Sequence, residues 1–338
     1  MTESVEQITV DWRRVGVFYA IALGGAVLVA VGIRVVVSAV GGEAAAVFGA
    51  AAAALLYMPL PLVAGLVVER VGGRGYLIGW EWRSLRAGFW RAYGRNVLIA
   101  VGLLLATLVC GFVVAWLAGL IGFPGAGHLV RNDAELHARL VELSPALAAA
   151  GPLPSIAVLA GAGIVQGLLA GITVNAFFAF GEEYGWRGVL ADELRPLGRV
   201  RSCLVTGVLW GFWHAPIIIA LGHNYGAQWG WGVFVMVVWT VPFSFLLTWA
   251  RERTGSVLAP AMLHGCFNGV IGLFVYLVID ANVLIGLPVG VLMGLTLAVL
   301  TVVVWRLRLP GLAAAEPVSP PSNSPDHRSS PQPGSSGG

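Results

Sequence analysis

A small set of polar side chains interrupts long apolar stretches of this 338-residue chain. The set comprises Glu182, Glu183 and Arg187 in "FAFGEEYGWRGVL", His214 in "LWGFWHAP", and His264 with Asn268 in "MLHGCFNG". An ionisable side chain inside a membrane helix costs at least ~2.5 kcal/mol on insertion scales, so such groups are candidates for function. Their positions therefore predict a functional site within the apolar part of the chain.

Helix geometry separates the two adjacent glutamates. Glu183 and Arg187 are four residues apart with the acid first, the better orientation for an ion pair on one helix face. Glu182 is rotated by ~100° from Glu183. We therefore expect Glu182 to find its partner on another helix.

The two histidine segments repeat the four-residue spacing. His264 shares a helix face with Asn268, and His214 shares one with Trp210. A carboxylate removed from water suits general-base catalysis near neutral pH, and a histidine beside it can share a water molecule. A second histidine and an amide can stabilise the oxyanion of a tetrahedral intermediate. If Glu182 meets both pairs, the set predicts hydrolysis of an acyl bond, in particular a peptide bond.

The composition places these residues in a membrane protein. The chain is 58% hydrophobic and 11% charged, with a mean hydropathy of +0.84, whereas soluble domains carry about 25% charged residues. The net charge of +3 comes from arginines in loops and not from one basic surface, so no binding of nucleic acid is predicted.

A bilayer core needs about 20 apolar residues per helix. The candidate spans are residues 15–39, 44–68, 96–122, 155–180, 203–222, 230–250, 256–279 and 283–305. The sequence thus predicts an all-α, polytopic integral membrane helix bundle of about eight transmembrane helices. Within the fourth span, "GLLAG" at 167–171 has the small-xxx-small spacing of close helix packing.

Arginine placement predicts the orientation. Arginines concentrate before the first span and in the connections 69–95, 181–202 and 251–255, which the positive-inside rule assigns to the cytoplasm. With an even number of spans, both termini are expected in the cytoplasm, in the plasma (inner) membrane, with the site facing the cytoplasmic side. We expect N-terminal helices at 1–154, a catalytic core at 155–280, a last transmembrane helix at 281–309 and a disordered tail at 310–338, which is rich in Pro, Ser and Gly.

Three motifs occur in a fixed order along the chain. "EEYGWR" fits Glu-Glu-x-x-x-Arg, "WGFWH" fits aromatic-x-x-x-His, and "HGCFN" fits His-x-x-x-Asn. Over roughly residues 155–280 the chain resembles the CAAX protease and bacteriocin-processing family of intramembrane proteases, relatives of the prenyl-protein endopeptidase. The resemblance implies an intramembrane endopeptidase.

The resemblance also implies roles for single residues. Glu182 would activate a water molecule with His214 as its partner, and Glu183 and Arg187 would support the site.

His264 and Asn268 would stabilise the oxyanion. The chain departs from the family at Trp210, where Phe is usual. A tryptophan keeps the aromatic wall and adds an N–H donor, so we expect an altered shape without loss of the chemistry.

Cofactor and substrate are left open by the sequence. The family is commonly labelled a metalloprotease, and Glu182, His214 and His264 could ligate Zn²⁺. The chain lacks the His-Glu-x-x-His spacing, however, and a glutamate-activated water needs no metal. The expected partners are a peptide or protein substrate, with or without an attached lipid, and membrane lipids.

Two other functions fit the same residues. A non-catalytic membrane protein with this fold could act as an immunity factor or scaffold. A transporter or proton relay could use the buried carboxylate, although no paired broken-helix repeat is recognisable.

Overall fold

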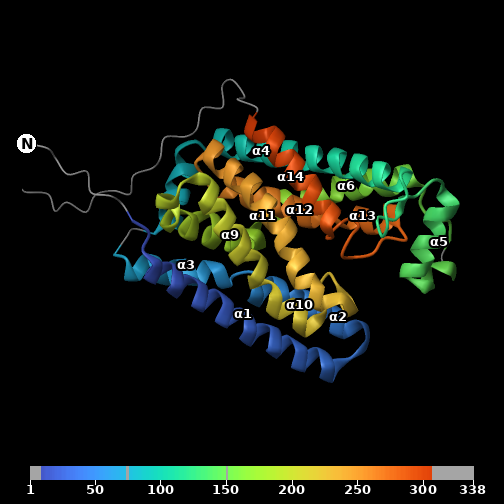
Figure 1. Cartoon of the computed structure of the whole chain (residues 1–338), viewed down its shortest axis with the longest axis horizontal. Coiled ribbons are helices and arrows are strands. Elements are labelled where there is room, and N and C mark those ends of the chain that lie inside the picture. The colour runs from blue at the N-terminus through green and yellow to red at the C-terminus, as the bar shows by residue number, and fades with distance from the viewer. Residues whose placement is uncertain (1–8, 74–75, 150, 307–338) are drawn as a thin grey trace, which may run out of the picture.

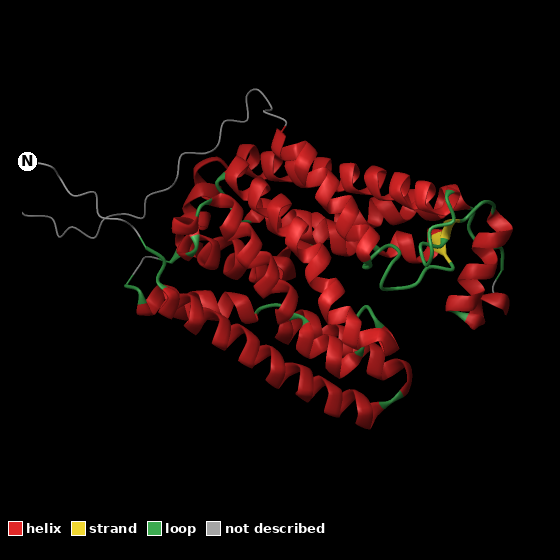
Figure 2. Ribbon diagram, in the orientation of Figure 1, coloured by secondary structure: helices red, strands yellow, loops and turns green. Residues whose placement is uncertain are grey.

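The fold is a bundle of helices (Figure 1), seen in a computed structural model that describes residues 9–73, 76–149 and 151–306. Within these residues the β-structure is confined to the short antiparallel pair β1 (His128–Leu129) and β2 (Val278–Ile279), at one end of the bundle (Figure 2). The predicted all-α class is confirmed. The predicted tail at 310–338 lies outside the described residues.

The described helices differ widely in length, from the three residues of α8 to the 44 of α4. The α-helices are α1 (Trp12–Val40), α2 (Gly42–Ala52), α3 (Leu60–Val71), α4 (Leu77–Leu120), α5 (Asp133–Leu143), α6 (Ile156–Ile172), α7 (Val174–Glu183), α8 (Ala191–Glu193), α9 (Arg199–Trp213), α10 (Ala215–Leu221), α11 (Trp229–Thr254), α12 (Leu258–Val270), α13 (Gly272–Leu277) and α14 (Val291–Arg306). The π-helices are η1 (Ala53–Tyr57) and η3 (Tyr184–Leu190), and the 3₁₀-helices are η2 (Pro145–Ala149), η4 (Arg195–Leu197) and η5 (Gly226–Gln228).

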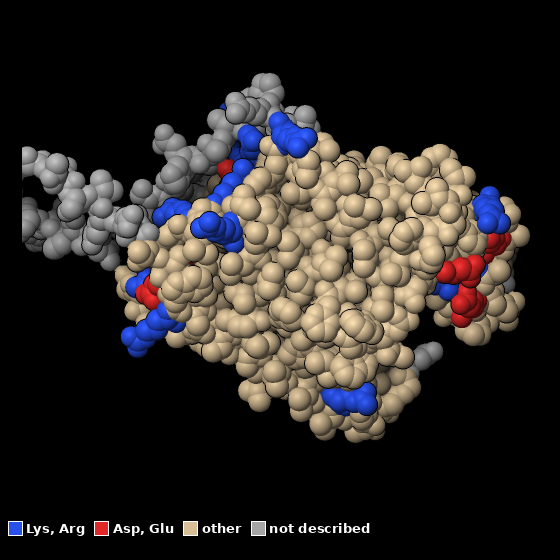
Figure 3. Space-filling view, in the orientation of Figure 1, with Lys and Arg blue, Asp and Glu red and all other residues tan. Residues whose placement is uncertain are grey.

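The described helices confirm a polytopic membrane protein. Six are long and apolar enough to cross a bilayer, and the bent pair Ile156–Ile172 and Val174–Glu193 gives up to seven. Charged side chains on the face in Figure 3 gather at its two ends, with one further basic side chain at the lower edge and a broad uncharged band between them. The predicted number of eight spans and the cytoplasmic position of both termini stay predictions.

Two predicted spans differ from the helices observed. The fourth bends by 52° between α6 and α7, because Thr173 leaves the helical conformation (φ −121, ψ −96) and its hydroxyl donates to Leu169 O at 2.6 Å. The last contains α14, which has 16 residues. The preceding residues 283–290 form turns and bends, since Gly286 and Pro288 disfavour a helix.

Helix α12 is the central element of the bundle. It contacts α4, α6, α7 and α11, and nearly all of its side chains are buried. A helix that is apolar on every side is expected to be surrounded by protein. The position of His264 on α12 is therefore set by four neighbouring helices.

Glycines bring α6 unusually close to α12. A Cβ atom built on Gly171 would lie 2.4 Å from Cys266 Cα, and one on Gly265 would lie 2.5 Å from Gly171 O. The small-xxx-small pattern at 167–171 thus serves close helix packing, as predicted. This crossing places α7 and α12 side by side.

We predict that Gly171→Ala lowers the free energy of unfolding by about 1–3 kcal/mol, the usual range for overpacking a core. The matched control is Gly161→Ala on the same helix, where an added Cβ meets nothing within 4 Å. Thermal unfolding of the purified variants in detergent compares the two. Equal stabilities would show that the crossing is not tightly packed.

Candidate active site

The two glutamates end α7 and lead into a buried π-helix. Every residue of η3 is buried, as are Glu182 and Glu183. π-Helical turns are frequent at functional sites. The segment fits tightly under α3, because a Cβ on Gly185 would lie 2.4 Å from Pro61 O. The sequence predicted an ordinary α-helix here, but after Glu183 the helix continues as the wider π-helix η3.

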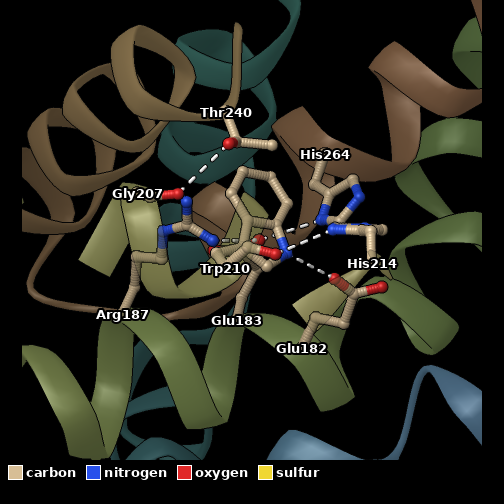
Figure 4. A network of polar contacts seen from close by, with 8 residues as sticks. All are labelled: Glu182, Glu183, Arg187, Gly207, Trp210, His214, Thr240 and His264. Atoms are coloured by element: carbon tan, nitrogen blue, oxygen red, sulfur yellow. Dashed lines mark hydrogen bonds and ion pairs between the residues drawn. The ribbon is translucent and has the colours of Figure 1, made fainter. Parts of the chain in front are cut away.

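A single carboxylate oxygen joins the first and third motifs. Glu183 Oε1 accepts hydrogen bonds from Arg187 Nη1 at 3.1 Å and from His264 Nδ1 at 2.9 Å (Figure 4). Glu183 and Arg187 are fully buried, and His264 is 6% exposed. In this environment each charge depends on its partner, since an unpaired buried ion is strongly destabilising. Glu183 therefore links η3 to α12.

The guanidinium of Arg187 has a second support. Its Cζ lies 4.0 Å from the ring centroid of Trp210, in the geometry of a cation–π interaction. Arg187 Nε and Nη2 have no protein partner among the described residues. Arg187 is thus held between the Glu183 carboxylate and the Trp210 indole.

Glu182 finds its partner on another helix, as its rotation from Glu183 requires. Trp210 Nε1 donates to Glu182 Oε2 at 2.8 Å, and Glu182 is 3% exposed. The tryptophan that replaces the phenylalanine of the family pattern therefore supplies a hydrogen bond that phenylalanine lacks. Glu182 Oε1 is left to meet another group.

His214 lies at the break between α9 and α10. The following Pro216 has no N–H to continue the helix, and His214 forms the C-cap of α9. Its Nδ1 is 2.8 Å from Trp210 O. A carbonyl only accepts, so Nδ1 carries the proton and Nε2 has a free lone pair. The half-buried His214 thus presents Nε2 as an acceptor.

The indole of Trp210 is the meeting point of the site. Its ring centroid lies 5.6 Å from that of His214 and 5.5 Å from that of His264, and Figure 4 shows the glutamates and Arg187 around it. The structure therefore brings together six of the seven residues singled out in the sequence.

Asn268 is the exception. It follows His264 by one turn of α12, but it is exposed, and no described residue hydrogen-bonds to its side chain. A different amide joins the helices, because Asn175 Nδ2 donates to Gly265 O at 3.2 Å. The expected pairing of Asn268 with His264 at an oxyanion stays a prediction.

The donor set does not suit a catalytic zinc ion. Such an ion takes three protein ligands, and the described residues contain no cluster of three His, Cys, Asp or Glu side chains that could hold a metal.

Two further carboxylates position the helices of the site. Glu81 accepts hydrogen bonds from Ser256 Oγ at 2.6 Å and from Val257 N at 2.8 Å, just before α12 begins. Burial raises the pKa of Glu81, and these two hydrogen bonds oppose the rise. Glu69 accepts from Tyr184 Oη at 2.6 Å, which anchors η3. Neither glutamate belongs to a motif, so the sequence offered no signal for its partner.

Comparison with known proteins agrees with this geometry. Residues 156–270 match the family model described as type II CAAX prenyl endopeptidase Rce1-like. This part of the chain belongs to the CAAX protease family. The CAAX protease segment runs from the start of α6 to the end of α12, so it holds every residue of the three motifs. Comparisons with curated proteins and with solved structures gave no match.

We predict that Glu183→Gln lowers the free energy of unfolding by about 3–5 kcal/mol, because it leaves the buried guanidinium of Arg187 without a counter-ion. Adding Arg187→Met should restore part of the loss. The control is Glu142→Gln in the exposed pair with Arg139, which should cost less than about 1 kcal/mol. The free energies of unfolding of the variants are compared in detergent. If Glu183→Gln is as stable as Glu142→Gln, the buried interaction of Glu183 with Arg187 is contradicted.

Proposed function

We propose that this protein is an intramembrane endopeptidase in which Glu182 and His214 activate a water molecule that attacks a peptide bond. The observation that carries the proposal is that both side chains hydrogen-bond to Trp210, Glu182 to its indole N–H and His214 to its main-chain carbonyl, inside a segment of the CAAX protease family. Trp210 holds one atom of each residue and leaves Glu182 Oε1 and His214 Nε2 for the water.

The proposed reaction uses these two free atoms. Glu182 Oε1 takes a proton from the water while His214 Nε2 accepts the other hydrogen bond and orients the water oxygen. The oxygen attacks the scissile carbonyl carbon and forms a tetrahedral intermediate. The C–N bond then breaks, and Glu182 returns the proton to the leaving amine.

The oxyanion of the intermediate needs a hydrogen-bond donor. We assign this role to His264, with Asn268 as the second donor after substrate binds. Glu183 contacts His264 Nδ1 at 2.9 Å, and the proposal uses the form of His264 in which both ring nitrogens carry a proton. That form keeps an Nε2–H to donate. Glu183 and Arg187 then act as supports that hold His264 in place.

We predict that Glu182→Gln and His214→Ala each lower kcat for peptide cleavage by at least about 100-fold, the scale of general acid–base catalysis. The control variants are Glu142→Gln and His137→Ala, which change a carboxylate and an imidazole outside the CAAX protease segment. Purified protein assayed with peptide substrates gives the rates, and a melting curve verifies folding.

Unchanged cleavage by both variants would end the peptidase proposal. A Glu182→Gln variant that also keeps the full cellular phenotype would instead favour an immunity factor or scaffold.

We further propose that the substrate carries a lipid. An apolar cavity of about 660 Å³ lies beside the site, lined by Phe180 of α7, Met262 of α12, and Ile78 and Tyr93 of α4. Phe180 precedes Glu183 by about one turn on the same helix. A cavity of this size suits a small apolar ligand, and each buried CH₂ group contributes about 0.8 kcal/mol.

The orientation of the site also belongs to this proposal. Arginines cluster in the connections that we assign to the cytoplasm. We therefore propose that the site of this plasma-membrane protein receives substrates from the cytoplasmic side.

We predict that Ile78→Trp, which extends a bulky ring over the cavity, raises KM for a lipidated peptide at least tenfold. The KM for the same peptide without lipid should change less than twofold. Leu98→Trp is the control, because Leu98 lies further along α4, beyond the kink at Gly88, is 75% exposed and does not line the cavity. Equal KM changes for both peptides would show that the lipid binds elsewhere.

A further inference from the structure

Tyr57 lies outside the CAAX protease segment, yet it contacts the backbone of the candidate site. It ends η1 in an otherwise apolar stretch and is 2% exposed. Its hydroxyl donates to Trp213 O at 2.6 Å. A buried hydroxyl with a backbone acceptor is a fixed contact, since an unmade hydrogen bond in such a place is costly.

The carbonyl that Tyr57 reaches belongs to the last residue of α9, directly before His214. In a continuous α-helix the Trp213 carbonyl would accept from the N–H of Ile217. The described backbone bonds at the break include Ile218 N to His214 O at 3.0 Å, but not that one. The Tyr57 hydroxyl donates to the Trp213 carbonyl instead. The Tyr57 hydroxyl thus satisfies the carbonyl that the break leaves without its helical partner, directly before His214.

Neighbouring contacts fix the same turn of the chain. The rings of Tyr57 and Trp213 have centroids 4.5 Å apart, and Trp213 Nε1 donates to Ala22 O of α1 at 3.1 Å. The residue after η1 also contacts α7, because a Cβ on Gly181 would lie 3.2 Å from Met58 O. The end of η1 therefore packs against the residues that directly precede both Glu182 and His214.

We propose that Tyr57 is a positioning residue for His214. Its hydroxyl holds the Trp213 carbonyl at the helix break, and this contact sets where the imidazole lies relative to the Glu182 carboxylate. The inference rests on the proposed peptidase function and adds a residue from the N-terminal helices to it. A displacement of about 1 Å at a catalytic group can lower a rate about 100-fold.

The test compares Tyr57→Phe with Tyr225→Phe. Tyr225 is a matched control because it is also 2% exposed, donates to a backbone carbonyl (Val289 O, 3.0 Å) and accepts an indole N–H from Trp239. Each variant loses one buried hydroxyl, so both melting temperatures should fall by similar amounts. We expect kcat to fall at least tenfold for Tyr57→Phe and less than twofold for Tyr225→Phe, with KM changed less than twofold in both.

Hydrogen–deuterium exchange provides a readout that does not depend on activity. In Tyr57→Phe, exchange of the peptide that contains residues 213–218 should be faster by at least tenfold, whereas Tyr225→Phe should leave it unchanged.

The outcomes separate the positioning role of Tyr57 from the proposed peptidase function. Equal kcat values and equal exchange in the two variants would overturn the role of Tyr57 while leaving an active peptidase. If the wild-type protein cleaves no peptide, the peptidase proposal fails, and the exchange result alone decides whether Tyr57 holds the break. Faster exchange with unchanged kcat would also overturn the positioning role.

Discussion

The site depends on burying charged groups in an apolar bundle without leaving any of them alone. Glu183 meets this constraint by joining Arg187 and His264 at one oxygen, and Trp210 meets it by covering Arg187 and donating to Glu182. Because a broken pair of this kind is strongly destabilising, the network fixes α7, α9 and α12 relative to one another. The remaining groups, Glu182 Oε1 and His214 Nε2, can then be left free for chemistry.

Much of this arrangement was predictable from residue spacing. The four-residue separation of Glu183 and Arg187 predicts their contact, and the rotation of Glu182 predicts a partner on another helix. Composition and apolar runs predict the all-α membrane bundle. These features could be read because they depend on local helix geometry, which sequence separation fixes directly.

Other features depend on packing between distant segments, and the sequence did not reveal them. The π-helix after Glu183 packs Gly185 closely against Pro61, and Asn268 is exposed on α12. Tyr57 reaches Trp213 across 156 residues of chain, so no local pattern marks it. The site thus extends beyond the matched segment 156–270 to the helices that come before it.

The most direct measurement of the central claim is a kinetic double-mutant cycle on Glu182 and His214. If both residues act on one water molecule, the double variant Glu182→Gln/His214→Ala should be no slower than the slower single variant, because residues that act as a unit are strongly non-additive. If the two losses in kcat simply multiply, each residue acts independently, and the shared-water site is contradicted.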